Sequence, residues 1–185
     1  MEIRQLTLGE IQTNCYLVSD KDGLSAVIDP AEAAPVLALA AREGLQIRAV
    51  LLTHGHFDHV GGVKALMEAL HCPVYVNECD LALPQWLRGG LAATDFYGEG
   101  DTVRVGALCF TVLETPGHTE GSVCLRCGDT LFTGDTLFAG GYGRTDFPGG
   151  DERKMRSSLA RLAALADDAT VCPGHGPRTT LQAER

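Results

Sequence analysis

Three histidines and one aspartate lie within six consecutive positions of this chain. His54, His56, Asp58 and His59 directly follow the apolar run 49–52, which is typical of a buried strand. Imidazole is the commonest metal ligand in proteins, and a divalent cation stabilises several imidazoles and a carboxylate gathered at one place. The spacing therefore predicts a metal site; the alternative is a polar loop that happens to be rich in histidine.

Three later segments share one form, in which a predicted strand is followed by a short glycine-containing turn with one ligand-type residue. Turns at strand ends hold such side chains rigidly and leave them accessible to a ligand. Each turn alone is a weak signal, because histidine and aspartate beside glycine are common in ordinary turns. The residues are His118 in the segment 115–119, Asp135 in 133–136 and His175 in 173–177.

The number of ligand-type side chains separates one metal from two. Five imidazoles and two carboxylates make seven donors, whereas a tetrahedral zinc site takes four. Seven donors suit two divalent metal ions that share one carboxylate. The sixth histidine, His71, lies at the end of a predicted helix and has no expected role.

Apolar periodicity and turn residues predict two successive runs of strands and helices. The first has strands at 3–8, 14–18, 26–28, 47–52 and 73–76, helices at 33–42, 60–70 and 78–83, and a loop at 89–100. The second has strands at 102–105, 108–113, 122–125, 130–132 and 170–172, a helix at 151–165 and a short helix from residue 179. This order predicts an α/β (α+β) fold with two sheets packed face to face and helices outside, in one domain over residues 1–185.

Composition limits the partners and the compartment. The 185 residues carry a net charge of −9, which disfavours a nucleic-acid partner because such proteins normally offer a basic surface. The chain shows neither an apolar run of membrane-spanning length nor a signal region at its start, so we expect a cytoplasmic protein that does not bind a membrane. Seven cysteines, an odd number, predict free thiols, and the C-x-x-C at 124–127 falls in a predicted strand. The oligomeric state stays open.

The H-x-H-x-D-H cluster and the three later turns resemble the metallo-β-lactamase superfamily over nearly the whole chain. The resemblance implies an αββα sandwich with two divalent metal ions at one edge, zinc first, with iron or manganese also compatible with these ligands. It implies that one metal is held by His54, His56 and His118, that the other is held by Asp58, His59 and His175, and that Asp135 bridges them.

Within the superfamily, the segments 14–18, 134–138 and 143–151 look like the glyoxalase II group, in particular its short bacterial members. That resemblance implies a small-molecule substrate, S-lactoylglutathione or a related glutathione thioester, attacked by a metal-bridging hydroxide. Asp58 would both ligate a metal and orient the hydroxide. Arg144 and Tyr142 would contact the substrate.

Two departures from the glyoxalase II pattern concern glutathione. The basic contact of the family falls on Arg144, but its tyrosine partner falls on Asp146, which cannot make the same contact. The chain also ends at Arg185, soon after His175, so the basic C-terminal region of full-length glyoxalase II is not expected. Thioester hydrolysis is therefore better supported than recognition of glutathione.

The main alternative is a persulfide dioxygenase of the same fold, which the segment 143–147 also resembles. Such enzymes use one iron held by the equivalents of His54, His118 and Asp135. The Pro-Gly-His-Gly-Pro motif at 173–177 favours the hydrolase. A nuclease is disfavoured by the charge, and a non-catalytic binding module is disfavoured by the complete set of ligands.

Overall fold

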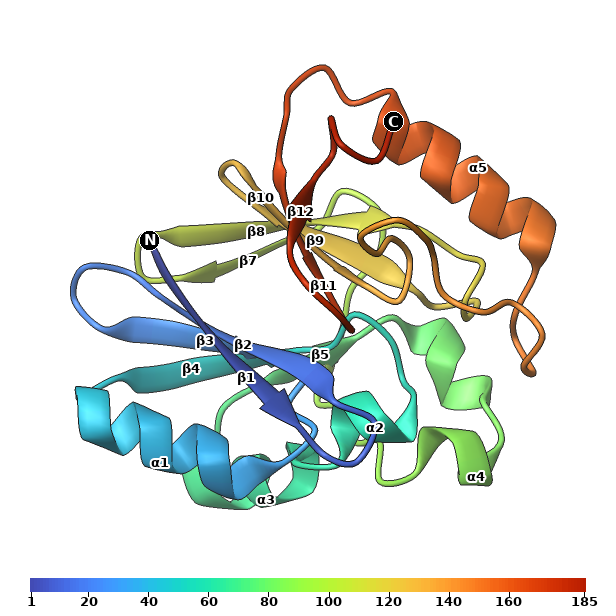
Figure 1. The fold of residues 1–185 in the computed structure, drawn as a ribbon. Coiled ribbons are helices and arrows are strands. Elements are labelled where there is room, and N and C mark those ends of the chain that lie inside the picture. Colours follow the sequence, from blue (N-terminus) through green and yellow to red (C-terminus); the bar gives the residue numbers. More distant parts are fainter.

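The computed structural model describes residues 1–185 and contains two six-stranded sheets that face each other (Figure 1). In the first sheet the strands lie in chain order: β1 (Glu2–Leu8), β2 (Thr13–Ser19), β3 (Leu24–Ile28), β4 (Gln46–Leu51), β5 (Val74–Val76) and β6 (Asp95–Phe96). In the second sheet the spatial order is β12 (Thr179–Thr180), β11 (Thr170–Pro173), β10 (Thr130–Gly134), β9 (Val123–Cys127), β8 (Leu108–Glu114) and β7 (Thr102–Val105).

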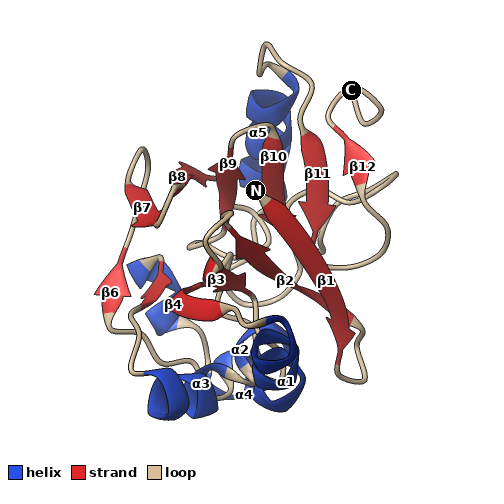
Figure 2. Cartoon of the chain, turned by 90° about the vertical axis from the view of Figure 1, so that its left-hand side faces the viewer, coloured by secondary structure: helices blue, strands red, loops and turns tan.

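Helices cover the outer side of each sheet (Figure 2). The first sheet is covered by α1 (Ala33–Glu43) and α3 (Val63–Leu70), with α2 (Phe57–Val60), the 3-10 helix η1 (Glu78–Ala82) and α4 (Gln85–Arg88) in its connections. The second sheet is covered by α5 (Glu152–Ala163). The predicted αββα arrangement is confirmed.

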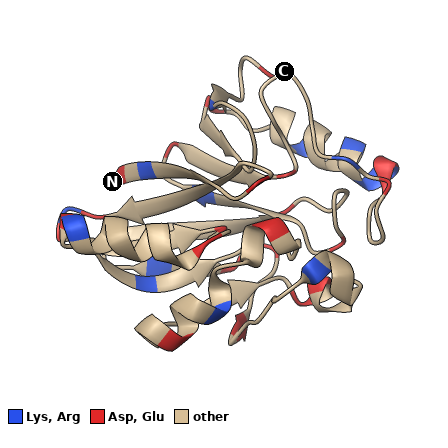
Figure 3. Ribbon diagram, turned by 60° about the horizontal axis from the view of Figure 1, so that its bottom comes forward, with Lys and Arg blue, Asp and Glu red and all other residues tan.

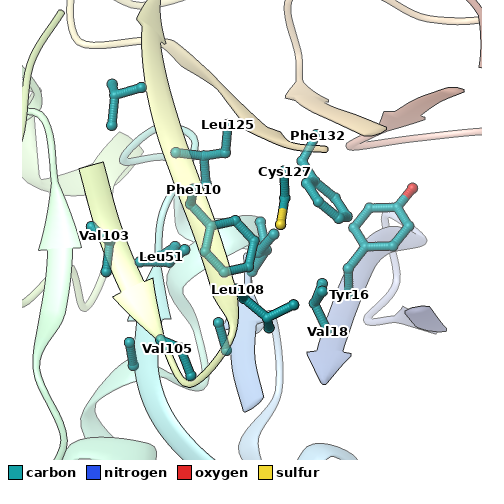
Figure 4. Packing of buried hydrophobic residues seen from close by; sticks show 14 of the residues in the cluster. Tyr16, Val18, Leu51, Val103, Val105, Leu108, Phe110, Leu125, Cys127 and Phe132 are labelled. Atoms are coloured by element: carbon teal, nitrogen blue, oxygen red, sulfur yellow. The ribbon is translucent and has the colours of Figure 1, made fainter. Parts of the chain in front are cut away.

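The alternation of buried side chains in the central strands explains this layering. In β2, Tyr16 and Val18 point between the sheets, where they pack with Phe110 and other apolar residues of the second sheet (Figure 4). Cys15 and Leu17 point to the other face and pack with apolar side chains of α1 and α3. Both faces of a central strand are therefore buried, and burial of both faces requires the nearly continuous apolar run found there.

The connections bring four segments to one edge of the sandwich. β3 and β4 are parallel and joined by α1, and β10 and β11 are parallel and joined by α5. Backbone hydrogen bonds then tie the sheets together at this edge: Val123 donates to Thr53 O at 2.9 Å, and Asn14 donates to Gly174 O at 2.7 Å. The segments that follow β4, β8, β10 and β11, which contain all seven predicted ligands, meet here.

The predicted helix at 60–70 is broken into two. Gly61 and Gly62 separate α2 from α3, and a Cβ on Gly61 would lie 2.4 Å from Ala31 O. Gly62 is equally constrained, because its N–H donates to Pro30 O at 2.8 Å and a Cβ there would lie 2.7 Å from that oxygen. The segment before α1 occupies the space that two side chains would need.

Three other element predictions differ from the structure. The predicted helix from residue 179 is wrong, because β12 pairs antiparallel with β11 and a turn follows it. The loop at 89–100 contains β6, which pairs with β5. The helix at 78–83 is the 3-10 helix η1, and α4 after it was not predicted.

Lys and Arg positions are spread over helices and strands, with Asp and Glu among them (Figure 3). None of the helices combines the length and the apolar character needed to cross a membrane. All seven cysteines are free thiols, and the C-x-x-C pair lies in β9 and at its end, as predicted.

Candidate metal centre

The first group of donors consists of His54, His56 and His118, whose ring nitrogens lie within 4.8 Å of one another. All three side chains are buried, and His118 Nε2 lies 2.8 Å from His56 Nδ1. The outer nitrogens are already oriented: His54 Nδ1 contacts Thr53 Oγ1 at 3.1 Å, and His118 Nδ1 contacts Arg144 O at 2.7 Å. A metal-binding imidazole normally has its second nitrogen fixed in this way.

The second group consists of Asp58, His59 and His175. Asp58 Oδ2 lies 3.3 Å from His175 Nε2 and 3.5 Å from His59 Nε2, and the two imidazole nitrogens are 3.4 Å apart. The three donor atoms thus converge on one point beside the first group.

Asp135 lies between the two groups. Its Oδ1 is 3.4 Å from His59 Nε2, and its Oδ2 is 3.4 Å from His118 Nε2 and 3.6 Å from His175 Nε2. One carboxylate therefore reaches both sets of ligands, which is the placement that a bridging role requires.

The chemistry of the donor set fits two divalent cations. His54 Nε2, His56 Nε2 and Asp135 Oδ1 are buried and have no hydrogen-bond partner. Buried polar atoms in native proteins nearly always have a partner, so ions in the centre would explain His54 Nε2 and Asp135 Oδ1, whereas His56 faces His118 through its other nitrogen, Nδ1. The structure brings together all seven residues predicted as ligands, and their assignment as metal ligands stays a prediction.

The protonation states of His54, His56 and Asp58 are those of metal ligands. Burial lowers the pKa of His54 well below its ordinary value, and burial with the nearby His118 lowers the pKa of His56 to about 3. Burial raises the pKa of Asp58, but the hydrogen bond from His175 and the charge of His59 outweigh it, and the net pKa is lowered. Neutral imidazoles and ionised carboxylates are the forms that bind a metal.

Asp29 is a site residue that the sequence analysis missed. It follows β3 and is buried, with a φ of 51°. Its Oδ2 accepts from Thr53 Oγ1 at 2.6 Å and lies 3.0 Å from His59 Nδ1, while Oδ1 accepts from Thr53 N at 2.8 Å. Both oxygens are thus engaged, so Asp29 orients His59 rather than adding an eighth donor. Burial alone would lower the pKa of His59, but Asp135 and Asp29 raise it well above its ordinary value.

The start of β2 supports the second group. Thr13 Oγ1 donates to Asp58 Oδ2 at 3.1 Å. Asn14 Nδ2 donates to Pro173 O at 3.0 Å, and Tyr16 Oη donates to the same carbonyl at 2.7 Å. These bonds hold the turn that carries His175. The sequence marked the segment 14–18 only through family resemblance.

The two predicted substrate residues are already partnered. Arg144 forms a two-bond ion pair with Asp146 at 2.7 and 2.8 Å, and its guanidinium carbon lies 3.7 Å from the centre of the Phe147 ring. Tyr142 is exposed, and its hydroxyl lies 3.2 Å from Glu152 Oε1. Arg144 is close to the centre through its carbonyl, and the cation is neutralised in place.

Two cavities and two aromatic rings border the centre. A cavity of about 300 Å³ includes Asn14 and His175 in its lining, and one of about 260 Å³ includes Thr13 and Asp58. On the other side the Phe147 ring lies 6.3 Å from that of His56. The ring of Trp86, the only tryptophan, lies 6.0 Å beyond Phe147 and was not predicted to be near the site.

Sequence comparison finds relatives over the whole chain. An uncharacterized protein of Mycobacterium leprae (strain TN) is 37% identical over an alignment of 209 positions. The alignment covers 100% of this chain and 96% of that protein. A hydroxyacylglutathione hydrolase of Salmonella typhi is 40% identical over 166 residues. That match covers 86% of this chain and 60% of the hydrolase.

Solved structures give the same fold. The crystal structure of the BLEG-1 B3 metallo-beta-lactamase aligns with a TM-score of 0.92 at 34% identity. The alignment covers 99% of this chain and 96% of the BLEG-1 chain. TTHA1623 in a di-iron-bound form aligns with a TM-score of 0.85 at 40% identity, over 98% of this chain and 96% of TTHA1623. ETHE1 from Myxococcus xanthus aligns with a TM-score of 0.87 at 35% identity, over 100% of this chain and 81% of ETHE1.

The family model for the metallo-beta-lactamase superfamily matches residues 8–175, a span that includes all seven predicted ligands. The two-sheet fold, the convergence of these side chains and the relatives all agree with that match. This chain belongs to the metallo-β-lactamase superfamily.

Proposed function

We propose that this chain is a dinuclear-metal hydrolase of thioesters, with S-lactoylglutathione or a related glutathione thioester as its substrate. The observation that carries the proposal is the position of Asp135, whose carboxylate lies 3.4 Å from His118 of the first group and 3.4 Å from His59 of the second. The relative named hydroxyacylglutathione hydrolase, 40% identical over 86% of this chain, supports the substrate class.

The side chains have distinct roles in the proposed reaction. Divalent ions held by the two groups and Asp135 would supply a hydroxide at neutral pH, because coordination lowers the pKa of water from 15.7 towards about 7, and would polarise the carbonyl under attack. Asp58, fixed by Thr13, orients the nucleophile. A thiol is acidic enough to leave as the thiolate, so the reaction needs no strong general acid.

Zinc is the metal we propose first, with iron and manganese as alternatives, because imidazole and carboxylate ligands suit all three. The di-iron-bound form of TTHA1623 makes metal analysis an essential part of any assay. Seven free thiols suit a reducing compartment, and we place the reaction in the cytoplasm.

The test is hydrolysis of S-lactoylglutathione by the purified, metal-loaded protein, followed as loss of the thioester absorbance. We expect a kcat/KM of roughly 10⁴ M⁻¹s⁻¹ or higher, which is ordinary enzyme efficiency. Feeble turnover by a protein with two metals bound would reject this substrate, and a panel of other thioesters would then test the wider class.

A second candidate is a mononuclear-iron persulfide dioxygenase, favoured by the similarity to ETHE1. Oxygen uptake with glutathione persulfide, together with one iron per chain, would establish it. The same preparation should be tested against a β-lactam, because BLEG-1 is described as a B3 metallo-beta-lactamase.

A further inference from the structure

We propose that Asp80 is a positioning residue for the metal centre, because it joins the loop between His54 and His56 to the loop that carries His118. The inference rests on the proposed function only in taking those histidines as metal ligands. No part of the proposed reaction uses Asp80, and no motif in the sequence marks it.

Asp80 contacts both loops through short hydrogen bonds. Its Oδ2 accepts from Gly55 N at 2.6 Å and from Thr119 Oγ1 at 3.0 Å, and its Oδ1 accepts from Gly121 N at 2.8 Å. Gly55 N belongs to the peptide bond that follows His54. A single side chain from η1 therefore contacts a residue adjacent to each of the three histidines of the first group, through the backbone of Gly55 and the hydroxyl of Thr119.

The glycines in these loops are matched to Asp80. A Cβ on Gly55 would lie 3.0 Å from Asp80 Cβ, and a Cβ on Gly121 would lie 2.6 Å from Asp80 Oδ1. Only residues without a side chain let the two backbones approach this carboxylate closely enough for their N–H groups to donate.

The environment of Asp80 is unusual for an ionised side chain. It is completely buried, and its three partners are neutral N–H or O–H groups rather than a cation. Burial of a charge without a counter-ion is costly, and bonds from neutral donors offset only part of that cost. A nearby pair of divalent cations would compensate it further, and the fixed negative charge would in turn favour their binding.

The chain contains a matched carboxylate that lies far from the site. The side chain of Asp20 also accepts three hydrogen bonds, all from backbone N–H groups. The donors are Asp22, Leu24 and Ala107, at 2.9 to 3.0 Å, and Asp20 is 7% exposed. It follows the end of β2 that is opposite to Thr13, the residue that contacts Asp58. A role for Asp80 that is only structural predicts that substitution of Asp20 and Asp80 has the same consequences.

The test compares Asp80→Asn with Asp20→Asn in the full chain. Apoprotein is titrated with zinc against a competing chelator and, separately, with cobalt, whose visible absorption reports the ligand geometry. We expect Asp80→Asn to weaken metal binding by about 10- to 100-fold, the usual cost of losing a group that orients ligands. The cobalt spectrum should also change, whereas Asp20→Asn should retain wild-type affinity and spectrum.

A second, milder variant provides the test if Asp80→Asn does not fold. Thr119→Val keeps the carboxylate and its two backbone bonds but removes the hydroxyl donor. It should weaken metal binding less than Asp80→Asn and more than Asp20→Asn. In the metal-free protein, the Gly55 amide should exchange its hydrogen faster in Asp80→Asn than in wild type.

Wild-type metal affinity and an unchanged cobalt spectrum in folded Asp80→Asn would overturn the proposal; if that variant does not fold, the same result for Thr119→Val would overturn it. Neither readout requires turnover. A protein that hydrolyses no thioester can therefore still confirm the role of Asp80, and failure of the two hypotheses can be told apart.

Discussion

At the scale of single residues, the candidate centre consists of proposed donors whose direction is fixed by a second side chain or by backbone. His59 is held by Asp29, and Asp58 is held by Thr13. Fixing each donor before a metal arrives reduces the conformational entropy that binding must overcome. Substitution of either a donor or its partner should therefore reduce metal binding or turnover more than overall stability.

Asp58→Ala should abolish hydrolysis while leaving a folded protein. The side chain is a proposed ligand and orients the nucleophile, and loss of such a group reduces the rate by about 10²- to 10⁴-fold. The measurement pairs turnover with a thermal unfolding curve. Asp20→Asn is the control, and retention of most turnover by Asp58→Ala would reject the assigned role.

Asp146→Asn should strengthen binding of an anionic thioester. The ion pair with Arg144 lowers the pKa of Asp146 to about 2 and occupies the cation that the substrate would need. Releasing an exposed pair has a modest effect, so we expect KM for S-lactoylglutathione to fall by up to about fivefold with kcat unchanged.

The control for this prediction is Asp167→Asn, which breaks the ion pair with Arg126 outside the substrate loop. Arg144→Ala should raise KM. If Asp146→Asn leaves KM unchanged, Arg144 does not contact the substrate, and this proposed contact is wrong.

The sequence allowed prediction of the side chains that converge at the candidate centre but not of the residues that orient them. His118 and His175 stand in glycine-containing turns after predicted strands, and their type alone suggests metal chemistry. Asp29, Thr13 and Asp80 are single polar residues beside strands or in a short helix, where a turn or cap residue looks the same. Their roles depend on contacts with residues 24 to 45 positions away in the chain.

At the scale of elements, β2 links the inter-sheet core to the turn that carries His175. Tyr16 packs in that core with its ring 5.3 Å from that of Phe132, and its hydroxyl donates to Pro173 O. The same strand that fills the core therefore also fixes the turn after β11. Displacement of β2 should disturb the second group of ligands before the first.

Tyr16→Phe tests this link. The variant keeps the ring and removes one buried hydrogen bond, at a cost of about 1 kcal/mol of folding free energy. We expect the second equivalent of zinc to bind about tenfold more weakly and the first to bind normally. Tyr97→Phe, which removes the bond to Leu52 O at 2.6 Å, is the control. Equal loss at the second site in both variants would contradict the link.

Elements with strong periodicity were predicted well, and those defined by a partner were not. The alternating strands of both sheets and α5 follow from their own apolar pattern. β12 has two residues, and only its pairing with β11 makes it a strand. Gly61 and Gly62 signalled close packing in the sequence, but the break between α2 and α3 depends on the backbone at Pro30, which no local pattern reveals.

At the scale of the whole molecule, the proposed ligands come from both sheets. His54, His56, Asp58 and His59 follow β4 of the first sheet, and His118, Asp135 and His175 follow strands of the second. Each proposed metal would therefore be bound by residues from both halves of the sandwich, and metal binding would add a connection between them at an edge otherwise held by a few hydrogen bonds.

Removal of the metals should accordingly lower the melting temperature of the whole chain. A ligand present at 1,000 times its Kd stabilises the folded state by about 4 kcal/mol, and each kcal/mol shifts Tm by about 2–4 °C in a domain of this size. Chelation should therefore lower Tm by about 8–16 °C for each ion lost, as measured by calorimetry, and zinc should restore it. If metal analysis shows complete removal and Tm is unchanged, the ions do not join the two sheets, and the seven donors do not form the centre proposed for them.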